Sequence, residues 1–379
     1  MKFASRLVSF DPAPLDRVRP MSTPIYQTAT FEQEFADSFG EYDYSRSGNP
    51  TRKVLEDQIA ALENGARGFC FSSGMAAIAT VTRLLQAGDE ILADWDLYGG
   101  ANRLFGKVLG RAGITVRYVD ASDPGNIIDR ITPATRLIYV ESPTNPLLRI
   151  VDLKTVAEAA QERGVRFCVD NSTMSPYLQN PLDLGADIVL HSATKFLCGH
   201  SDVTGGALVV NDPKLAEDIY FLQNAEGGAL GPFDCFLLLR GLKTLKLRMD
   251  VQQRNAEAVA QFLTTHPKVS SVHYPGLSTH RDFEIQQSQA RGGGAVLSFT
   301  VGSHGAAKRV AEGSKLFRIS VSFGSINSTI SIPLRMSHAS VPIDLRALRS
   351  LPEDLLRLSI GIEDDEDLIQ DLSKQLDAI

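Results

Sequence analysis

The chain has 379 residues, enough for one large domain and at least one smaller one. Its composition, 43% hydrophobic and 22% charged, is ordinary for a globular protein and argues against extensive disorder. The net charge of -7 is spread along the chain, so nothing in it attracts nucleic acid or an anionic membrane surface.

The spacing of the cysteines and the length of the hydrophobic runs indicate the cellular compartment of the protein. The sequence has no C-x-x-C pair and no histidine cluster near a cysteine, which argues against a structural zinc site and against a disulfide framework. No run approaches the roughly 18 apolar residues of a membrane span, and the first residues lack the apolar core of a signal peptide. We therefore expect a cytoplasmic enzyme or binding protein without a metal site or a membrane partner.

Three regions differ in pattern. Residues 1–46 are rich in Pro, Thr, Tyr and Phe with little periodicity, which is typical of an arm that packs on another surface. Residues 47–245 alternate amphipathic helices with short apolar strands, a pattern that implies a mostly parallel sheet covered on both faces. Residues 246–379 indicate a smaller α+β domain. The strands expected in the large domain lie in RGFCFSSG, DEILADW, ITVRYVD, TRLIYVES, VRFCVDNS, ADIVLHSA and GGALVVND.

The carboxyl ends of these strands are the place to look for a site, because ligands bind there in open α/β sheets. In FSSGMAA (71–77) a strand stops, a glycine permits a tight turn and a helix begins. The free N–H groups at such a helix start suit a phosphate. An ordinary strand-to-helix turn explains this stretch about equally well, and it is neither G-x-G-x-x-G nor a Walker sequence.

A carboxylate and an amine stand at two other strand ends. Asp170 ends an apolar strand, where its charge is costly unless a cation such as a protonated pyridine meets it; capping of the next turn is the alternative. Lys195 follows Ser192 and Thr194, and burial would make its amine a usable nucleophile and base; extension into water is the alternative. With Tyr98 after the second strand, this set suits an aromatic, cationic, phosphorylated cofactor that forms an imine with lysine.

Residues 192–195 also match the Ser-x-x-Lys motif of serine acyl-transfer enzymes. The partner motifs S-D-N and K-T-G are incomplete, because Val203 follows Ser-Asp and Leu245 follows Lys-Thr. The serine also follows a strand rather than opening a helix, which argues against a hydrolase. The histidines near these loops are more simply explained as hydrogen-bonded structural residues: His191, His200 and His338.

Seven motifs occur in order along nearly the whole chain: YSRSGNPT (44–51), FSSGMAA (71–77), ESPTNP (141–146), VDNS (169–172), HSATKF (191–196), RGLKTL (240–245) and LRLSIGIED (356–364). They resemble the Cys/Met-metabolism family of pyridoxal phosphate enzymes. The resemblance implies the α/β fold of PLP-dependent transferases (fold type I), with a mostly parallel large-domain sheet, a C-terminal α+β domain and an N-terminal arm. It also implies pyridoxal 5'-phosphate as cofactor, an amino-acid substrate and a homotetramer, a dimer of dimers with shared active sites.

The resemblance assigns roles by position. Lys195 matches the lysine that forms the imine, Asp170 the partner of the pyridinium nitrogen, and Tyr98 the tyrosine that stacks on the ring and assists catalysis. The other matched residues fall into three groups: Gly74, Met75, Ser192 and Thr194 around the phosphate; Tyr44 and Arg46, which reach the phosphate in the neighbouring subunit; and Asn145, Ser322 and Arg357 around the substrate, where Arg357 suits a carboxylate.

Two features favour cleavage at the β-carbon of the substrate. Val321 stands where family members that act at the γ-carbon commonly carry a glutamate, and residues 221–245 and 321–340 are similar to plant-type cystathionine β-lyases. We therefore expect a carbon–sulfur lyase of methionine biosynthesis that converts cystathionine to homocysteine, pyruvate and ammonia. Cystathionine γ-synthase, cystathionine γ-lyase and methionine γ-lyase activities stay open. A non-catalytic cofactor-binding protein is also open, although Lys195 and Asp170 argue against it.

Overall fold

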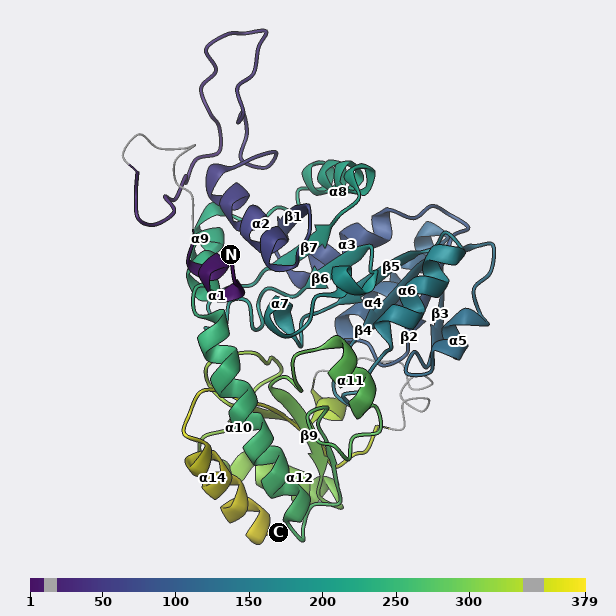
Figure 1. Cartoon of the computed structure of the whole chain (residues 1–379), viewed down its shortest axis with the longest axis vertical. Helices are drawn as coiled ribbons and strands as arrows, with labels where there is room; N and C mark the ends of the chain where they lie inside the picture. Colours follow the sequence, from purple (N-terminus) through teal and green to yellow (C-terminus); the bar gives the residue numbers. More distant parts are fainter. Residues whose placement is uncertain (10–18, 337–350) are drawn as a thin grey trace.

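The computed structural model describes residues 1–9, 19–336 and 351–379. A larger body and a smaller body are joined along the long helix α10 (Leu245–Thr265), and a loop near the N-terminus projects from the larger body (Figure 1). His338 lies outside the described residues. Among the described helices, none combines the length and the apolar character needed to cross a membrane.

A seven-stranded sheet forms the centre of the larger body, in the order β1-β7-β6-β5-β4-β2-β3. Strand β7 runs opposite to the other six. The predicted fold class, with its mostly parallel sheet, is confirmed. The strands are β1 (Arg67–Phe71), β2 (Glu90–Asp94), β3 (Thr115–Val119), β4 (Thr135–Glu141), β5 (Arg166–Asp170), β6 (Ile188–His191) and β7 (Gly206–Val210).

Helices cover both faces of this sheet, and their ends follow local sequence signals. Helix α2 starts after Asn49, whose side chain accepts hydrogen bonds from the N–H groups of Thr51 and Arg52. Helix α6 is capped in the same way by Asp152. The helices are α2 (Pro50–Leu62), α3 (Gly74–Arg83), α4 (Gly99–Lys107), α5 (Pro124–Ile128), α6 (Leu153–Glu162), α7 (Ser175–Leu178), α8 (Pro213–Glu226) and α9 (Pro232–Leu242), with short 3-10 helices η1 (Leu109–Ala112) and η2 (Pro181–Leu184).

The smaller body holds a five-stranded sheet in the order β10-β11-β12-β9-β8. Its apolar side chains pack against α10, α12 and α14 in a separate hydrophobic core. The sequence limits predicted for the three regions stay predictions. The elements are β8 (Ser271–His273), α11 (Phe283–Gln289), β9 (Val296–Thr300), α12 (His304–Gly313), β10 (Arg318–Ile319), β11 (Thr329–Ser331), η3 (Pro333–Arg335), β12 (Leu355–Ser359) and α14 (Asp365–Asp377).

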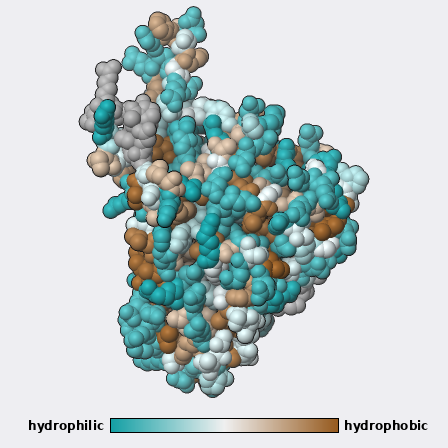
Figure 2. Space-filling model, in the orientation of Figure 1, coloured by the Kyte–Doolittle hydropathy of each residue, from teal (hydrophilic) through white to brown (hydrophobic). Residues whose placement is uncertain are grey.

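The N-terminal region has two parts with different surroundings. Helix α1 (Phe3–Val8) packs on α2 of its own chain, where Leu7 is buried. Residues 28–45 instead form the projecting loop, on which Phe35 is 58% exposed and Phe39 71% exposed. Figure 2 shows hydrophobic residues gathered near the tip of this loop, away from the rest of the molecule. The loop therefore carries apolar surface that its own chain leaves uncovered.

Candidate active site

A cavity with an empty volume of about 860 Å³ lies at the carboxyl end of the large sheet. Residues from the ends of four parallel strands and from the start of α3 line it, together with Phe323 from the smaller body. The structure thus brings together most residues that the sequence singled out. Those that line the cavity are Gly74, Met75, Tyr98, Asn145, Asp170, Ser192, Thr194 and Lys195.

One wall of the cavity is the start of α3 and the loop after β6. Ser73 caps the helix, since its Oγ accepts the N–H of Ala76 at 3.1 Å. A Cβ on Gly74 would lie only 3.0 Å from the Cβ of Ser192, so a larger residue would push these two segments apart. The first N–H groups of a helix have no partner within the helix. This helix start and the nearby hydroxyls fit a phosphate group.

Asp170 is a buried carboxylate at the cavity wall. Its Oδ1 accepts the N–H of Ser172 at 3.0 Å and the hydroxyl of Ser172 at 2.5 Å, and its Oδ2 accepts the Tyr139 hydroxyl at 3.3 Å. Asp170 therefore does cap the turn that follows it. Burial raises the pKa of Asp170, opposed by the bonds from Ser172. Because no cation within the described ranges forms an ion pair with it, the site fits a cationic ring nitrogen.

Lys195 points into the cavity rather than to water. Its Nζ donates a hydrogen bond to Ser322 Oγ at 2.6 Å and lies 4.9 Å from the ring centre of Phe323. Burial and then the charge of Arg357 lower the pKa of Lys195 to about 8, while Asp170 acts in the opposite direction. A larger neutral fraction near neutral pH makes this amine a usable nucleophile and base.

Arg357 reaches the site from β12 and is almost fully buried. Its Nη1 donates to Asn145 Oδ1 at 3.2 Å, and its Nη2 donates to the carbonyl of Ser322 at 3.0 Å. The Nε atom is buried without a hydrogen-bond partner among the residues of the structure that are described. A guanidinium with an unused buried donor fits a carboxylate ligand.

Four further residues shape the site, and sequence reasoning gave them no role. Glu141 accepts the backbone N–H of Tyr98 at 2.8 Å, and Ser172 and Tyr139 hold Asp170. A signal existed for Glu141 and Ser172, which stand at strand ends, and for Tyr139, which lies on the same strand face as Glu141. No pattern pointed to Phe323.

Tyr44 and Arg46 are not among the lining residues of this cavity. The Arg46 guanidinium lies 5.4 Å from the ring centre of Tyr44, near the base of the projecting loop. Their predicted contact with the cofactor of a neighbouring subunit stays a prediction. Two of the histidines that the sequence singled out have structural partners, since His191 Nε2 lies 2.5 Å from Glu63 Oε1 and His200 Nδ1 lies 2.7 Å from the Cys198 carbonyl.

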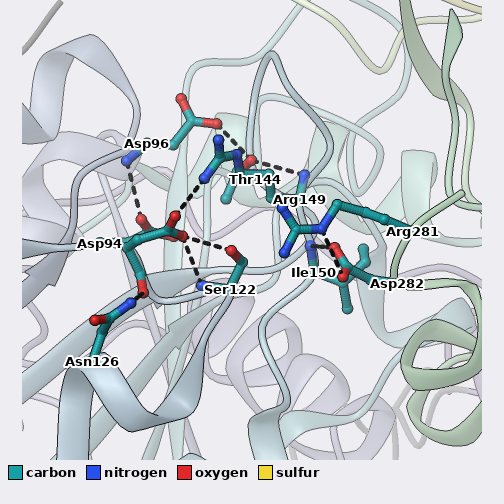
Figure 3. Close-up of polar contacts among 10 residues, drawn as sticks. Asp94, Asp96, Ser122, Asn126, Thr144, Arg149, Ile150, Arg281 and Asp282 are labelled. Atoms are coloured by element: carbon teal, nitrogen blue, oxygen red, sulfur yellow. Dashed lines mark hydrogen bonds and ion pairs between the residues drawn. The ribbon is translucent and has the colours of Figure 1, made fainter. Parts of the chain in front are cut away.

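An acidic cluster lies at the carboxyl end of β2 (Figure 3). The N–H of Asp96 donates to Asp94 Oδ1 at 3.1 Å, and Thr144 Oγ1 donates to Asp96 Oδ2 at 2.6 Å. Arg149 forms an ion pair with Asp120 at 2.8 Å. Burial, followed by the charge of Asp96, raises the pKa of Asp94 to about 7.

The pKa of Asp94 makes stability depend on pH. Because this pKa is higher in the folded state than in the unfolded chain, folding disfavours the ionised form, and stability falls as pH rises from about 4 to about 7. Asp94→Asn removes the ionisation, so we expect a gain of about 2–4 kcal/mol over the wild type at pH 8 that shrinks toward pH 4. Urea unfolding of the cofactor-free protein at several pH values measures this gain in stability. Exposed Asp129→Asn is the control, and a pH-independent difference for Asp94→Asn contradicts the prediction.

Known proteins are similar to this chain in sequence and in fold. Residues 6–377 match the family described as Cys/Met metabolism PLP-dependent enzyme. The chain is 52% identical over 361 residues to the chloroplastic cystathionine beta-lyase of Mimosa pudica, covering 95% of this chain and 79% of that protein. It is 46% identical to the cystathionine gamma-lyase of Bacillus subtilis, covering 96% of each. The structure of cystathionine gamma-lyase from Lactobacillus plantarum complexed with L-serine matches with a TM-score of 0.97 and 42% identity, covering 100% of this chain and 99% of that one. The chain therefore belongs to the family of Cys/Met-metabolism enzymes that depend on pyridoxal phosphate (PLP).

Proposed function

We propose that this protein is a carbon–sulfur lyase of methionine biosynthesis that cleaves cystathionine at the β-carbon, giving homocysteine, pyruvate and ammonia. The observation that carries the chemistry is that Lys195 and the buried Asp170 line one cavity, next to the buried Arg357, which donates to Asn145 in the cavity wall. This chain is 52% identical to the cystathionine beta-lyase of Mimosa pudica, and this similarity supports the choice of substrate.

The residues in and next to the cavity would each have a separate role in binding or catalysis. Asp170 would pair with the ring nitrogen of PLP, Tyr98 would lie against the ring, and the start of α3 would hold the phosphate. Bound PLP supplies an electron sink for the α-carbon of an amino acid. Arg357 would orient the substrate carboxylate, and the Lys195 amine, already hydrogen-bonded to Ser322 Oγ, would remove the α-proton.

The residue before Ser322 supports cleavage at the β-carbon. Val321 is exposed, and its carbonyl accepts a weak hydrogen bond from Arg357 Nη2 at 3.5 Å, so the position borders the substrate side of the site. An apolar side chain there offers no carboxylate to the far end of a substrate. Cystathionine γ-lyase activity is the second candidate, because the Bacillus subtilis relative of that name is 46% identical.

Identification of the keto acid formed from cystathionine tests the proposal. Purified enzyme with bound PLP is incubated with L-cystathionine, and the products are separated by chromatography. We expect pyruvate together with homocysteine, and none with Lys195→Ala protein. Formation of 2-oxobutyrate and cysteine would instead assign the enzyme to cleavage at the γ-carbon, and absence of any keto acid would favour a non-catalytic protein.

We also propose that the active unit is a dimer, within a homotetramer, whose two sites are completed by the N-terminal arm of the other chain. The projecting loop carries exposed Phe35 and Phe39. Arg46 at the base of this loop adds a cation that is not among the residues lining the cavity of its own chain. Both features suit a segment that lies against a second copy and adds positive charge to its phosphate site.

Mixed dimers test the shared site. Lys195→Ala and Arg46→Ala proteins are each expected to be nearly inactive alone. If chains mix at random, about half of the dimers contain one chain of each kind. If Arg46 serves the partner's site, each of these mixed dimers has one intact site of two. Co-expression is then expected to restore about one quarter of the wild-type activity. Two-tag purification and an activity assay measure the recovery. A mixture as inactive as its components contradicts the shared site.

We propose the cytoplasm as the compartment. The four cysteines are free and buried in the structure, which suits a reducing environment. Fractionation of cells that express the tagged protein tests this proposal, and recovery from an oxidising compartment would contradict it.

A further inference from the structure

Glu141 and Asp170 form a pair of carboxyl groups in the cavity. They are register partners at the ends of the neighbouring parallel strands β4 and β5, and both line the cavity. Each is only 6% exposed. Neighbouring strands are about 4.8 Å apart, and two carboxyl groups buried side by side at their ends each disfavour ionisation of the other. This arrangement favours a proton on one of the two.

Hydrogen bonds decide which carboxyl group is ionised. Asp170 accepts two bonds from Ser172 and one from the Tyr139 hydroxyl, and the positive charge that His191 can carry also favours its ionised form. Glu141 accepts one hydrogen bond within the described part of the chain, from the backbone N–H of Tyr98 at 2.8 Å. The ionised form of Asp170 thus receives more hydrogen bonds than that of Glu141, which favours the proton on Glu141.

The other charged groups around Glu141 act in the same direction. Asp94 and Asp96 lie near it at the end of β2, and either one disfavours ionisation of Glu141 when it is itself ionised. No ion pair joins Glu141 to a cation in the part of the chain that is described, and Lys195, which lines the same cavity, donates to Ser322 instead. Burial first, and then Asp170, raises the pKa of Glu141 well above its usual range.

We propose that Glu141 is a positioning residue that stays protonated in the working enzyme, holds Tyr98 in place, and leaves Asp170 as the single negative carboxylate of the cavity. Tyr98 is the residue before α4, so the bond to its N–H fixes where the helix starts and where the tyrosine ring stands. Ionisation of Glu141 would add a second negative charge beside the one that serves the ring nitrogen. The inference rests on the proposed active site and not on which carbon is cleaved.

Three variants separate this role from a general structural one. Glu141→Gln keeps the shape and an acceptor for the Tyr98 N–H but cannot ionise, whereas Glu141→Ala removes the acceptor. Glu56→Gln is the control, because Glu56 is also buried and accepts a backbone N–H, that of Cys70 at 2.9 Å, but does not line the cavity; unlike Glu141 it also pairs with Arg52 at 3.6 Å. The measurements are the infrared spectrum, the dissociation constant of PLP from the apoenzyme, and the pH profiles of kcat and KM.

Two readouts need no substrate, so they stay informative if the proposed reaction is wrong. The infrared difference between wild type and Glu141→Gln, recorded with bound PLP at neutral pH, is expected to show the carbonyl stretch of a protonated carboxyl group. A carboxylate signal in its place would overturn the proposal. The dissociation constant of PLP is expected to rise about tenfold in Glu141→Ala, and less than threefold in Glu141→Gln and Glu56→Gln.

Kinetics give the remaining test. Glu141→Ala is expected to lower kcat by about 10- to 100-fold with a smaller change in KM, because the ring of Tyr98 loses its fixed position. Glu141→Gln is expected to recover most of that loss and to lose any alkaline decline that ionisation of Glu141 causes. Equal losses in the two variants would mean that an ionised Glu141 is required, and no loss in Glu141→Ala would remove its positioning role.

Discussion

Lys195→Ala is expected to lower kcat by at least about 10⁴-fold, because it removes both the nucleophile and the base of the proposed reaction. The Nζ atom lies 2.6 Å from Ser322 Oγ inside the cavity, and no other lysine lines that cavity in the described structure. The variant is also expected to lose the visible absorbance that depends on the bond between the lysine and PLP. Stopped assays of pyruvate formation and an absorbance scan measure the two effects.

The control for this prediction is Lys214→Ala. Lys214 is a surface lysine of α8 that forms an ion pair with Asp218, so its removal tests only the loss of a positive charge from the chain. We expect wild-type kcat and absorbance for it. Lys195→Ala protein that keeps more than about 1% of wild-type kcat would show that another group takes the α-proton, and the assignment of Lys195 would be wrong.

The fold and the centre of the site could be predicted because they depend on local patterns. Apolar strands alternating with helices indicate a covered parallel sheet, and ligands bind at the carboxyl ends of its strands. That rule alone located Asp170 and Lys195. The sequence left open whether Lys195 is buried or extends into water, and only the structure shows that its amine lies in the cavity.

Contacts between distant segments could not be predicted from such patterns. Arg357 lies within an apolar strand, LRLS, and only the resemblance to known enzymes gave it a role; its bond to Asn145 joins residues of the two bodies. The pairing of Glu141 with Asp170 depends on the register of β4 and β5, which a sequence does not display. The roles of Arg357 and Glu141 depend on contacts between elements that are far apart in the sequence.

The loop after β10 gives another example. Ser322 and Phe323 come from the smaller body and meet Lys195 of the larger one, so the amine is positioned by both. Periodicity in residues 318–331 is too short to place either side chain. The smaller body therefore contributes to the site itself as well as to the stability of the chain.

Asp170→Asn is expected to lower kcat by about 10²- to 10⁴-fold. An ion pair between a carboxylate and a ring nitrogen about 3 Å apart is worth roughly 5 kcal/mol at an effective dielectric constant of 20, and this attraction keeps the ring protonated. Asparagine keeps the hydrogen bonds to Ser172 but removes the charge. Kinetic assays and the dissociation constant of PLP measure the effect. Asp187→Asn is the control, because Asp187 accepts a backbone N–H at the opposite end of the sheet, from Phe167 at 2.7 Å.

The same substitution is expected to change stability in the opposite direction. Burial raises the pKa of Asp170 above its value in the unfolded chain, so without PLP stability falls as the pH rises from the unfolded to the folded pKa and stays lower above it. Asp170→Asn should therefore raise the Tm of the cofactor-free protein at pH 8 while it weakens the binding of PLP. A lower Tm in the cofactor-free variant would contradict this explanation. An increase would show that Asp170 is kept for its charge toward the cofactor, at a cost to the stability of the chain that carries it.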